Sequence, residues 1–184
     1  SYVTVNNPLQ ITIGFDEPLD SASIYSAVWS VNNSVAVVLV NAQIPDYVEV
    51  TLTLNPALSF NTLYEVSVTG LTDCSGNSVA INKLNFVLPE AGSPGDLIVN
   101  EILFDPRTGG VDFVEIYNST DKYIDLKDWK IANYDHKNDT IDNVNDIPIQ
   151  IVLNPRDFLV LTEDSSNIMD EYPQSIVGKF YEIA

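Results

Sequence analysis

The chain of 184 residues has little cysteine, few basic residues and no long apolar runs. A single cysteine, Cys74, excludes an intrachain disulfide, so the fold depends on packing alone. Eight lysines and arginines against 26 aspartates and glutamates leave a net charge of -18, which repels phosphate backbones and anionic lipid surfaces. No apolar run reaches the roughly 18 residues of a membrane-spanning helix. We therefore expect no nucleic-acid partner and no direct membrane insertion.

The sequence patterns of common catalytic centres are also absent. His136 is the single histidine, so neither a zinc site with paired histidines nor a Ser-His-Asp triad can be assembled persuasively. The patterns G-x-x-x-x-G-K-[ST], G-x-G-x-x-G and G-x-S-x-G, which bind phosphates or carry a nucleophile, do not occur. We predict that this chain has no catalytic residues and is not an enzyme.

Apolar residues make up 45% of the chain, enough for a packed core. From Val48 to Leu54, in VEVTLTL, apolar and polar residues alternate with the period of a half-buried strand. Helical periodicity is limited to short turns near Ser21–Tyr25 and Asn167–Tyr172. The sequence therefore predicts an all-β protein. The expected strands are Leu9–Phe15, Val35–Val40, Val48–Leu54, Tyr64–Thr69, Leu84–Leu88, Leu97–Phe104, Phe113–Tyr117, Trp129–Ala132, Ile147–Val152 and Phe158–Thr162.

A polar run with prolines and glycines, residues 89–95, separates two series of strand signals. The charge changes there as well. Residues 1–93 hold eight acidic residues and one basic residue, net -7, whereas residues 94–184 hold 18 acidic and seven basic residues, net -11. We predict two linked β-sandwiches, formed by residues 1–91 and 96–184.

The second series contains three short motifs in a fixed order. An N-E pair ends its first strand, E-I-x-N ends the next, and L-x-x-W follows an aspartate-rich turn. The motif residues are Asn100, Glu101, Glu115, Asn118 and Trp129. This order resembles the lamin tail domain, an immunoglobulin-like (Ig-like) β-sandwich of nuclear lamins and of many bacterial surface and secreted proteins. The resemblance implies a binding or spacer module without catalysis.

The resemblance covers residues 96–165 well and fades after Glu163. Lamin tail domains usually continue through further strands, so we expect the closing strands to be missing. A sheet edge left open in this way pairs readily with another chain, including a second copy of this one.

The motif residues allow two interpretations. If the two strands are neighbours, Glu101 and Glu115 approach each other as an acid pair, but catalysis by two carboxylates also needs a cleft and a raised pKa. Polar residues at strand ends are more often hydrogen-bonded to nearby groups. We favour this structural role over a ligand or metal site. Trp129, at the start of a strand, is predicted to lie in the core, and Trp29 with it.

The first series has its own motifs, FDEPLD at 15–20 and D-C-S-G-N at 73–77. They resemble the bacterial Ig-like domain of surface-layer and other exported proteins. The second motif also has a direct physical interpretation. Asp73 caps the turn through its carboxylate, while Gly76 and Asn77 tolerate a positive φ, so that the chain can reverse.

The stretch from Asn133 to Asp146 is the most acidic part of the chain, and we expect it to be a loop. Calcium binds six to eight oxygen ligands, which closely spaced aspartates supply. The spacing is not that of an EF-hand, and most acidic loops are solvated, so a structural calcium is the less favoured alternative. The loop 105–112 would add oxygens. The predicted metal ligands are Asp135, Asp139, Asp142 and Asp146.

Together the two resemblances imply a non-catalytic spacer and interaction module of a larger bacterial protein, extracellular or in the cell envelope. The expected partner is a protein or a cell-envelope glycan. Two alternatives stay open. One is an accessory region of a secreted nuclease, phosphatase or other hydrolase whose catalytic domain lies outside this chain. The other is a carbohydrate-binding module, which would need exposed aromatic side chains on one sheet face.

Overall fold

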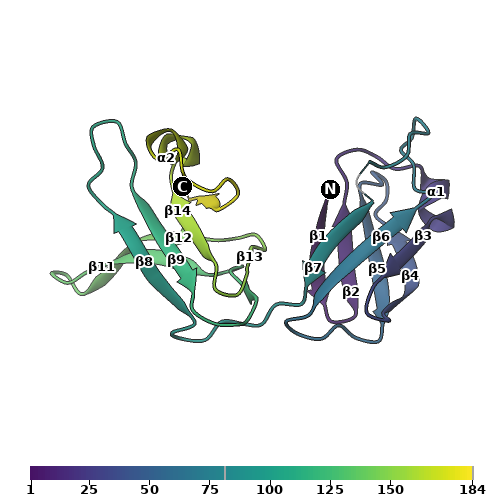
Figure 1. Ribbon diagram of the computed structural model, residues 1–184, viewed down its shortest axis with the longest axis horizontal. Coiled ribbons are helices and arrows are strands. Elements are labelled where there is room, and N and C mark those ends of the chain that lie inside the picture. Colours follow the sequence, from purple (N-terminus) through teal and green to yellow (C-terminus); the bar gives the residue numbers. More distant parts are fainter. Residues whose placement is uncertain (81, 184) are drawn as a thin grey trace. The chain divides into compact units, whose positions relative to one another are not determined.

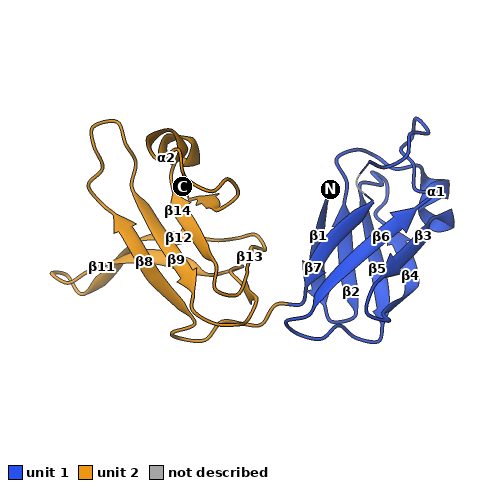
Figure 2. Cartoon of the chain, in the orientation of Figure 1, with its two compact units in different colours: residues 1–88 blue, residues 89–184 orange. Residues whose placement is uncertain are grey.

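The computed structural model describes residues 1–80 and 82–183, which form two compact units, Ser1–Leu88 and Pro89–Ala184 (Figure 2). Nearly all regular structure consists of strands, so the predicted all-β fold class is confirmed. The division lies at the start of the polar run 89–95.

Unit 1 is a sandwich of two antiparallel sheets (Figure 1). One sheet has the order β1-β2-β5-β4 and the other the order β3-β6-β7. The strands are β1 (Tyr2–Asn7), β2 (Gln10–Gly14), β3 (Val28–Val31), β4 (Ala36–Ala42), β5 (Glu49–Asn55), β6 (Leu63–Thr69) and β7 (Lys83–Val87).

The core of unit 1 follows from the alternation in these strands. In β5, Val50, Leu52 and Leu54 are buried, whereas the residues between them are partly exposed. Strand β6 contributes Tyr64 and Val66 from the facing sheet, and both belong to the same core. Each fully buried aliphatic side chain stabilises the fold by roughly 1.5–3 kcal/mol, so the alternating pattern fixes which face of each strand turns inward.

A short helix, α1 (Ser21–Ser26), begins after Asp20, whose carboxylate accepts a hydrogen bond from the Ser23 amide at 2.7 Å. The helix holds Trp29 in place, because the indole Nε1 donates to the carbonyl oxygen of Ile24 at 3.0 Å. Trp29 is buried in the core, where the sequence analysis expected it.

Unit 2 contains one larger sheet, of order β15-β14-β9-β8, and two small antiparallel pairs, β10-β13 and β11-β12. Strand β15 is parallel to β14, and the other neighbours are antiparallel. A helix, α2, lies between β14 and β15 in the chain. The elements are β8 (Leu97–Leu103), β9 (Phe113–Asn118), β10 (Ile124–Asp125), β11 (Lys130–Asp135), β12 (Thr140–Asp146), β13 (Val152–Leu153), β14 (Phe158–Thr162), α2 (Ser165–Glu171) and β15 (Phe180–Glu182).

Part of the polar run belongs to unit 2. The amide of Glu90 donates to the carbonyl oxygen of Tyr123 at 2.8 Å, and Glu90 forms a parallel bridge with Ile124. Gly92 lies directly under the Trp129 ring, since a Cβ added there would be 2.6 Å from Cζ2 of the indole. Trp129 is partly buried against the core of this unit, which contains Ile124, Leu126, Ile147, Leu153, Leu159 and Leu161.

Two expectations about unit 2 are wrong. Residues 147–152 do not form a strand, because Pro148 lacks an amide hydrogen and Ile147 already donates its own to Trp129; only Val152 enters a short strand. The acidic stretch from Asn133 to Asp146 is not a loop but the hairpin β11-β12, in which Tyr134 lies opposite Ile141. Strands β1, β3, β10, β12 and β15 were not predicted.

Candidate functional site

Asn118 is a buried structural residue at the end of β9, with 0% of its surface exposed. Its Nδ2 donates to the carbonyl oxygens of Lys122 at 2.7 Å and Asn154 at 2.9 Å. Its Oδ1 accepts from the amide and the hydroxyl of Thr120, at 3.0 and 2.7 Å. The carboxamide therefore joins the end of β9 to the turn after it and to the chain beyond β13.

The acid pair lies on the other face of the same sheet. Glu101 is directly opposite Glu115 in the antiparallel pair β8-β9, next to an irregularity in register between Val99 and Glu101. Asn100, at this irregularity, donates through Nδ2 to Glu115 Oε1 at 2.6 Å. The two strands are neighbours, and the structure brings Asn100, Glu101 and Glu115 together.

The register continues this row across the sheet. Glu115 lies opposite Val160 in β14, and Val160 is paired with Phe180 in β15. Paired residues share a face, so Glu101, Glu115, Val160 and Phe180 form one row on one side of the sheet.

Helix α2 and the segment after it border this face and line, together with the sheet, a cavity of about 410 Å³ that is open to solvent. Apolar and aromatic side chains form most of its lining, and Glu101 and Glu115 carry its negative charges. The rings of Phe113 and Tyr172 meet edge to face, with centroids 6.5 Å apart. The cleft was not predicted from the sequence. A signal was present in the apolar run from Phe158 to Leu161, because a strand that is apolar on both faces is usually covered on both.

The cation in the cavity lining is already neutralised. Lys179 Nζ forms an ion pair with Asp157 and lies 5.8 Å from the centroid of the Phe158 ring. Burial acts to raise the pKa of Asp157, but hydrogen bonds from Lys179 and the Phe158 amide outweigh it, so the pKa is lower than usual. The Lys179–Asp157 pair therefore adds no net charge to the cavity.

The four carboxylates of the hairpin have separate partners. Asp135 accepts from the Lys137 amide at 2.8 Å, the first of several hydrogen bonds that lower its pKa. Asp139 accepts from the Tyr134 hydroxyl, which raises the pKa of the tyrosine. Asp146 forms an ion pair with Lys130 at 2.6 Å, and Asp142 is 3.5 Å from the Thr140 hydroxyl. Among residues 1–80 and 82–183 no three His, Cys, Asp or Glu side chains are grouped as metal ligands.

The loop 105–112 is attached to α2 instead of the hairpin. Arg107 Nε lies 2.6 Å from Glu171 Oε1, and Asn167 Nδ2 donates to the carbonyl oxygen of Gly109 at 2.9 Å. His136 lies in the hairpin turn, edge to face with Tyr134. The structure does not bring the loop's oxygens to the four aspartates as a shared cage.

In unit 1, Asp73 organises the D-C-S-G-N turn. Its carboxylate accepts from the side chain of Asn77 at 2.7 Å, from the Asn77 amide at 2.8 Å and from the Ser75 amide at 2.8 Å. These bonds, led by the Asn77 side chain, lower the pKa of Asp73. Gly76 has the expected positive φ of 85°, whereas Asn77 does not.

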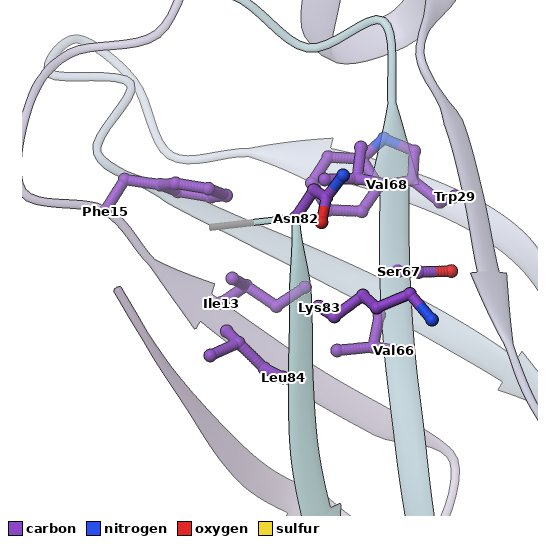
Figure 3. A pocket seen from close by; sticks show the side chains of 9 residues that line it. All are labelled: Ile13, Phe15, Trp29, Val66, Ser67, Val68, Asn82, Lys83 and Leu84. Atoms are coloured by element: carbon purple, nitrogen blue, oxygen red, sulfur yellow. The ribbon is translucent and has the colours of Figure 1, made fainter. Parts of the chain in front are cut away.

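A hollow between the two sheets of unit 1 holds only about 10 Å³. Figure 3 shows apolar side chains around it, among them Ile13, Trp29 and Leu84. A space of this size holds at most about one water molecule, so it is a packing defect and no ligand site.

A second apolar crevice, of about 180 Å³, lies on the core side of β8 in unit 2 and is bordered by Val99 and Trp129. Trp129 is thus partly accessible, while Trp29 is buried and hydrogen-bonded. No helix among the described residues is long and apolar enough to span a membrane.

Comparisons with known proteins agree with the fold. The family model of the bacterial Ig-like domain matches residues 2–87, and that of the lamin tail domain matches residues 90–180. Over 91 residues the chain is 40% identical to alkane uptake protein B of Marinobacter nauticus. That match covers 47% of this chain and 8% of the relative. No solved structure matches the chain. Domains of these two kinds are typically non-catalytic. The chain thus consists of a region that matches the bacterial Ig-like domain family, followed by a region that matches the lamin tail domain family.

Proposed function

We propose that the chain is a spacer and interaction module, without catalysis, of a larger bacterial protein in the cell envelope or outside the cell. The observation that carries this proposal is the apolar edge of the lamin tail domain. Strand β8 is the last strand of its sheet and exposes Val99 by 57% and Ile102 by 56%, and Phe104 after it is 81% exposed.

An edge strand offers unpaired amides and carbonyls to an incoming strand, and proteins usually protect such edges with lysine, proline or a covering segment. Strand β8 contains neither lysine nor proline. Its exposed valine and isoleucine favour addition of a strand from a partner, which gains backbone hydrogen bonds and buries apolar surface. The large net negative charge of the chain opposes pairing with a second copy, so a different protein is the preferred partner.

The Ig-like domain supports a spacer role. The strands described in residues 1–80 and 82–88 form a close-packed sandwich with one continuous core, and the hollow within it is too small for a ligand. The similarity to 8% of the length of alkane uptake protein B fits a module that recurs within much longer proteins.

Binding of the fluorescently labelled chain to intact cells of the source bacterium tests the proposal. We expect saturable binding that Val99→Lys reduces, because lysine on an edge strand opposes strand addition. Val28→Lys is the matched control: Val28 is a similarly exposed valine on β3, an edge strand of the other unit. Equal loss of binding in both variants would contradict the proposed edge.

Location and catalysis are tested separately. Antibodies against the purified chain should label intact cells; labelling that requires permeabilised cells would contradict an exposed location. A broad screen of hydrolase substrates should give no turnover, and turnover abolished by Glu101→Gln or Glu115→Gln would contradict the absence of catalysis.

A further inference from the structure

The cavity beside α2 in the lamin tail domain has the size and lining of a ligand site. Its volume of about 410 Å³ lies within the usual range of roughly 300–1,000 Å³ for small-molecule sites. Phe113, Phe158 and Phe180 come from three neighbouring strands, and Tyr172 follows α2. The polar residues in this lining determine what kind of ligand the cavity accepts.

The unneutralised charges in the cavity are negative. Glu101 and Glu115 form no ion pair with any residue of the ranges 1–80 and 82–183, and Lys179 is paired with Asp157. Like charges directly opposite on neighbouring strands destabilise a sheet. A ligand with a positive charge would remove this repulsion, whereas an anion would add to it.

The other residues that line the cavity indicate which kind of cation it can hold. A divalent metal requires several oxygen ligands, but the described residues show no group of three metal-ligating side chains here. One Glu115 oxygen is already bonded to Asn100. An organic cation with an aliphatic stem fits better, because its stem packs against apolar walls and its charged head is attracted by aromatic faces and carboxylates.

We propose that this cavity binds an alkylammonium or guanidinium group on an aliphatic stem, with Glu101 and Glu115 receiving the charge and the aromatic side chains enclosing the stem. The same chemistry occurs in a free amine and in a lysine or arginine side chain of a partner protein. This inference goes beyond the proposed function, because it does not depend on where the protein lies or on the β8 edge.

Titration of the whole ¹⁵N-labelled chain, followed by amide chemical shifts, tests the proposal. The probes are n-butylammonium for the free amine and Nα-acetyl-lysine methylamide for the side chain of a partner. We expect saturable shifts around Glu101, Glu115 and Phe180, with dissociation constants on the order of millimolar for such small probes. Saturation by either probe supports the proposal, and a response to the lysine derivative alone identifies a partner protein as the source.

Titrations with a neutral alcohol and with a sugar can contradict the proposal. If n-butanol binds as tightly as n-butylammonium, the cavity is merely apolar and the proposal fails. It also fails if methyl glucoside shifts these amides while both cations do not, or if no probe shifts them.

Two double variants show whether binding depends on the charges in the cavity or on the net charge of the protein. Glu101→Gln with Glu115→Gln should weaken n-butylammonium binding at least about tenfold, because two charge-assisted contacts are lost. Asp139→Asn with Asp142→Asn removes the same charge from exposed positions of the hairpin β11-β12, outside the cavity lining, and should leave binding unchanged. The cavity variant is expected to fold, since it removes like charges from two paired strand positions. Equal binding by both variants would overturn the proposal.

Discussion

Asn118 and Asn154 are joined by a hydrogen bond of 2.9 Å, from the Asn118 carboxamide to the Asn154 carbonyl oxygen, that closes one end of the lamin tail domain. The Asn118 side chain is fully buried and has partners for both its nitrogen and its oxygen. Since the lamin tail motif includes this residue, its role in the motif is explained by backbone hydrogen bonding.

We expect Asn118→Asp to destabilise unit 2 by at least about 2 kcal/mol, because a carboxylate would face backbone carbonyl oxygens with no hydrogen to donate. Each unit contains one tryptophan, so urea unfolding followed by Trp129 emission in a Trp29→Phe background reports on unit 2 alone. Asn143→Asp, at an exposed position of β12, is the control and should change little. Equal effects would contradict the structural role.

Gly92→Ala should also destabilise unit 2, by about 1–3 kcal/mol, because the added Cβ overlaps the Trp129 ring. The clash involves Cζ2 of the indole, an atom that phenylalanine lacks. Trp129→Phe should therefore remove most of the penalty of Gly92→Ala. Thermal unfolding of the four variants in a double-mutant cycle, followed by circular dichroism, measures this coupling; additive effects would mean that the two residues do not touch.

Asp73 should make the stability of unit 1 depend on pH in the acid range. Its pKa is about 3.8 in the unfolded chain and lower in the folded one, so the folded state is favoured when the carboxyl is ionised. This contribution is complete well above pH 3.8 and is lost as the pH falls through the folded pKa. Asp73→Asn should lose stability at pH 7 and approach the parent chain at low pH.

Unfolding by urea at a series of pH values, with Trp29 emission in a Trp129→Phe background, measures this dependence. Asp46→Asn is the control, because it removes one carboxylate from an exposed position of the same unit. A constant difference between Asp73→Asn and the parent chain across the acid range would show that ionisation of Asp73 does not contribute.

The sequence predicted the features that local chemistry determines. Alternation along β5 identified Val50, Leu52 and Leu54 as core residues, and the D-C-S-G-N motif identified a turn stabilised by Asp73. The family resemblances located both domains and placed Asn118 at a strand end. In these cases the local structure depends on residues that are close to one another in the sequence.

The features that depend on distant residues were not predictable in this way. Strand β12 is exposed along most of its length and lacks an apolar face, so its pairing with β11 has no signature in the sequence. The cavity beside α2 depends on how Tyr172 and Phe180 return to the sheet after β14. Neither the hydrophobic periodicity nor the spacing of motifs in the sequence specifies how these residues return to the sheet.

Residues 1–88 and 89–184, produced separately, should each unfold cooperatively, because each unit has its own core and the described contacts cluster within the units. The midpoint of each piece, measured by its own tryptophan, should lie close to that of the same unit in the whole chain. A piece that is unfolded by itself, or a midpoint shifted by many degrees, would mean that the two units depend on each other.

Calcium should not stabilise the hairpin β11-β12, although four aspartates lie on it. Each carboxylate has its own partner, and the four are not grouped as a cage. A ligand that binds only the folded state at 100 times its dissociation constant adds about 2.7 kcal/mol, which would raise the melting temperature by several degrees. We expect equal melting temperatures in millimolar calcium and in chelator at fixed ionic strength. A rise in calcium that Asp142→Asn abolishes would restore the metal site; a rise that this variant leaves unchanged would place the calcium elsewhere.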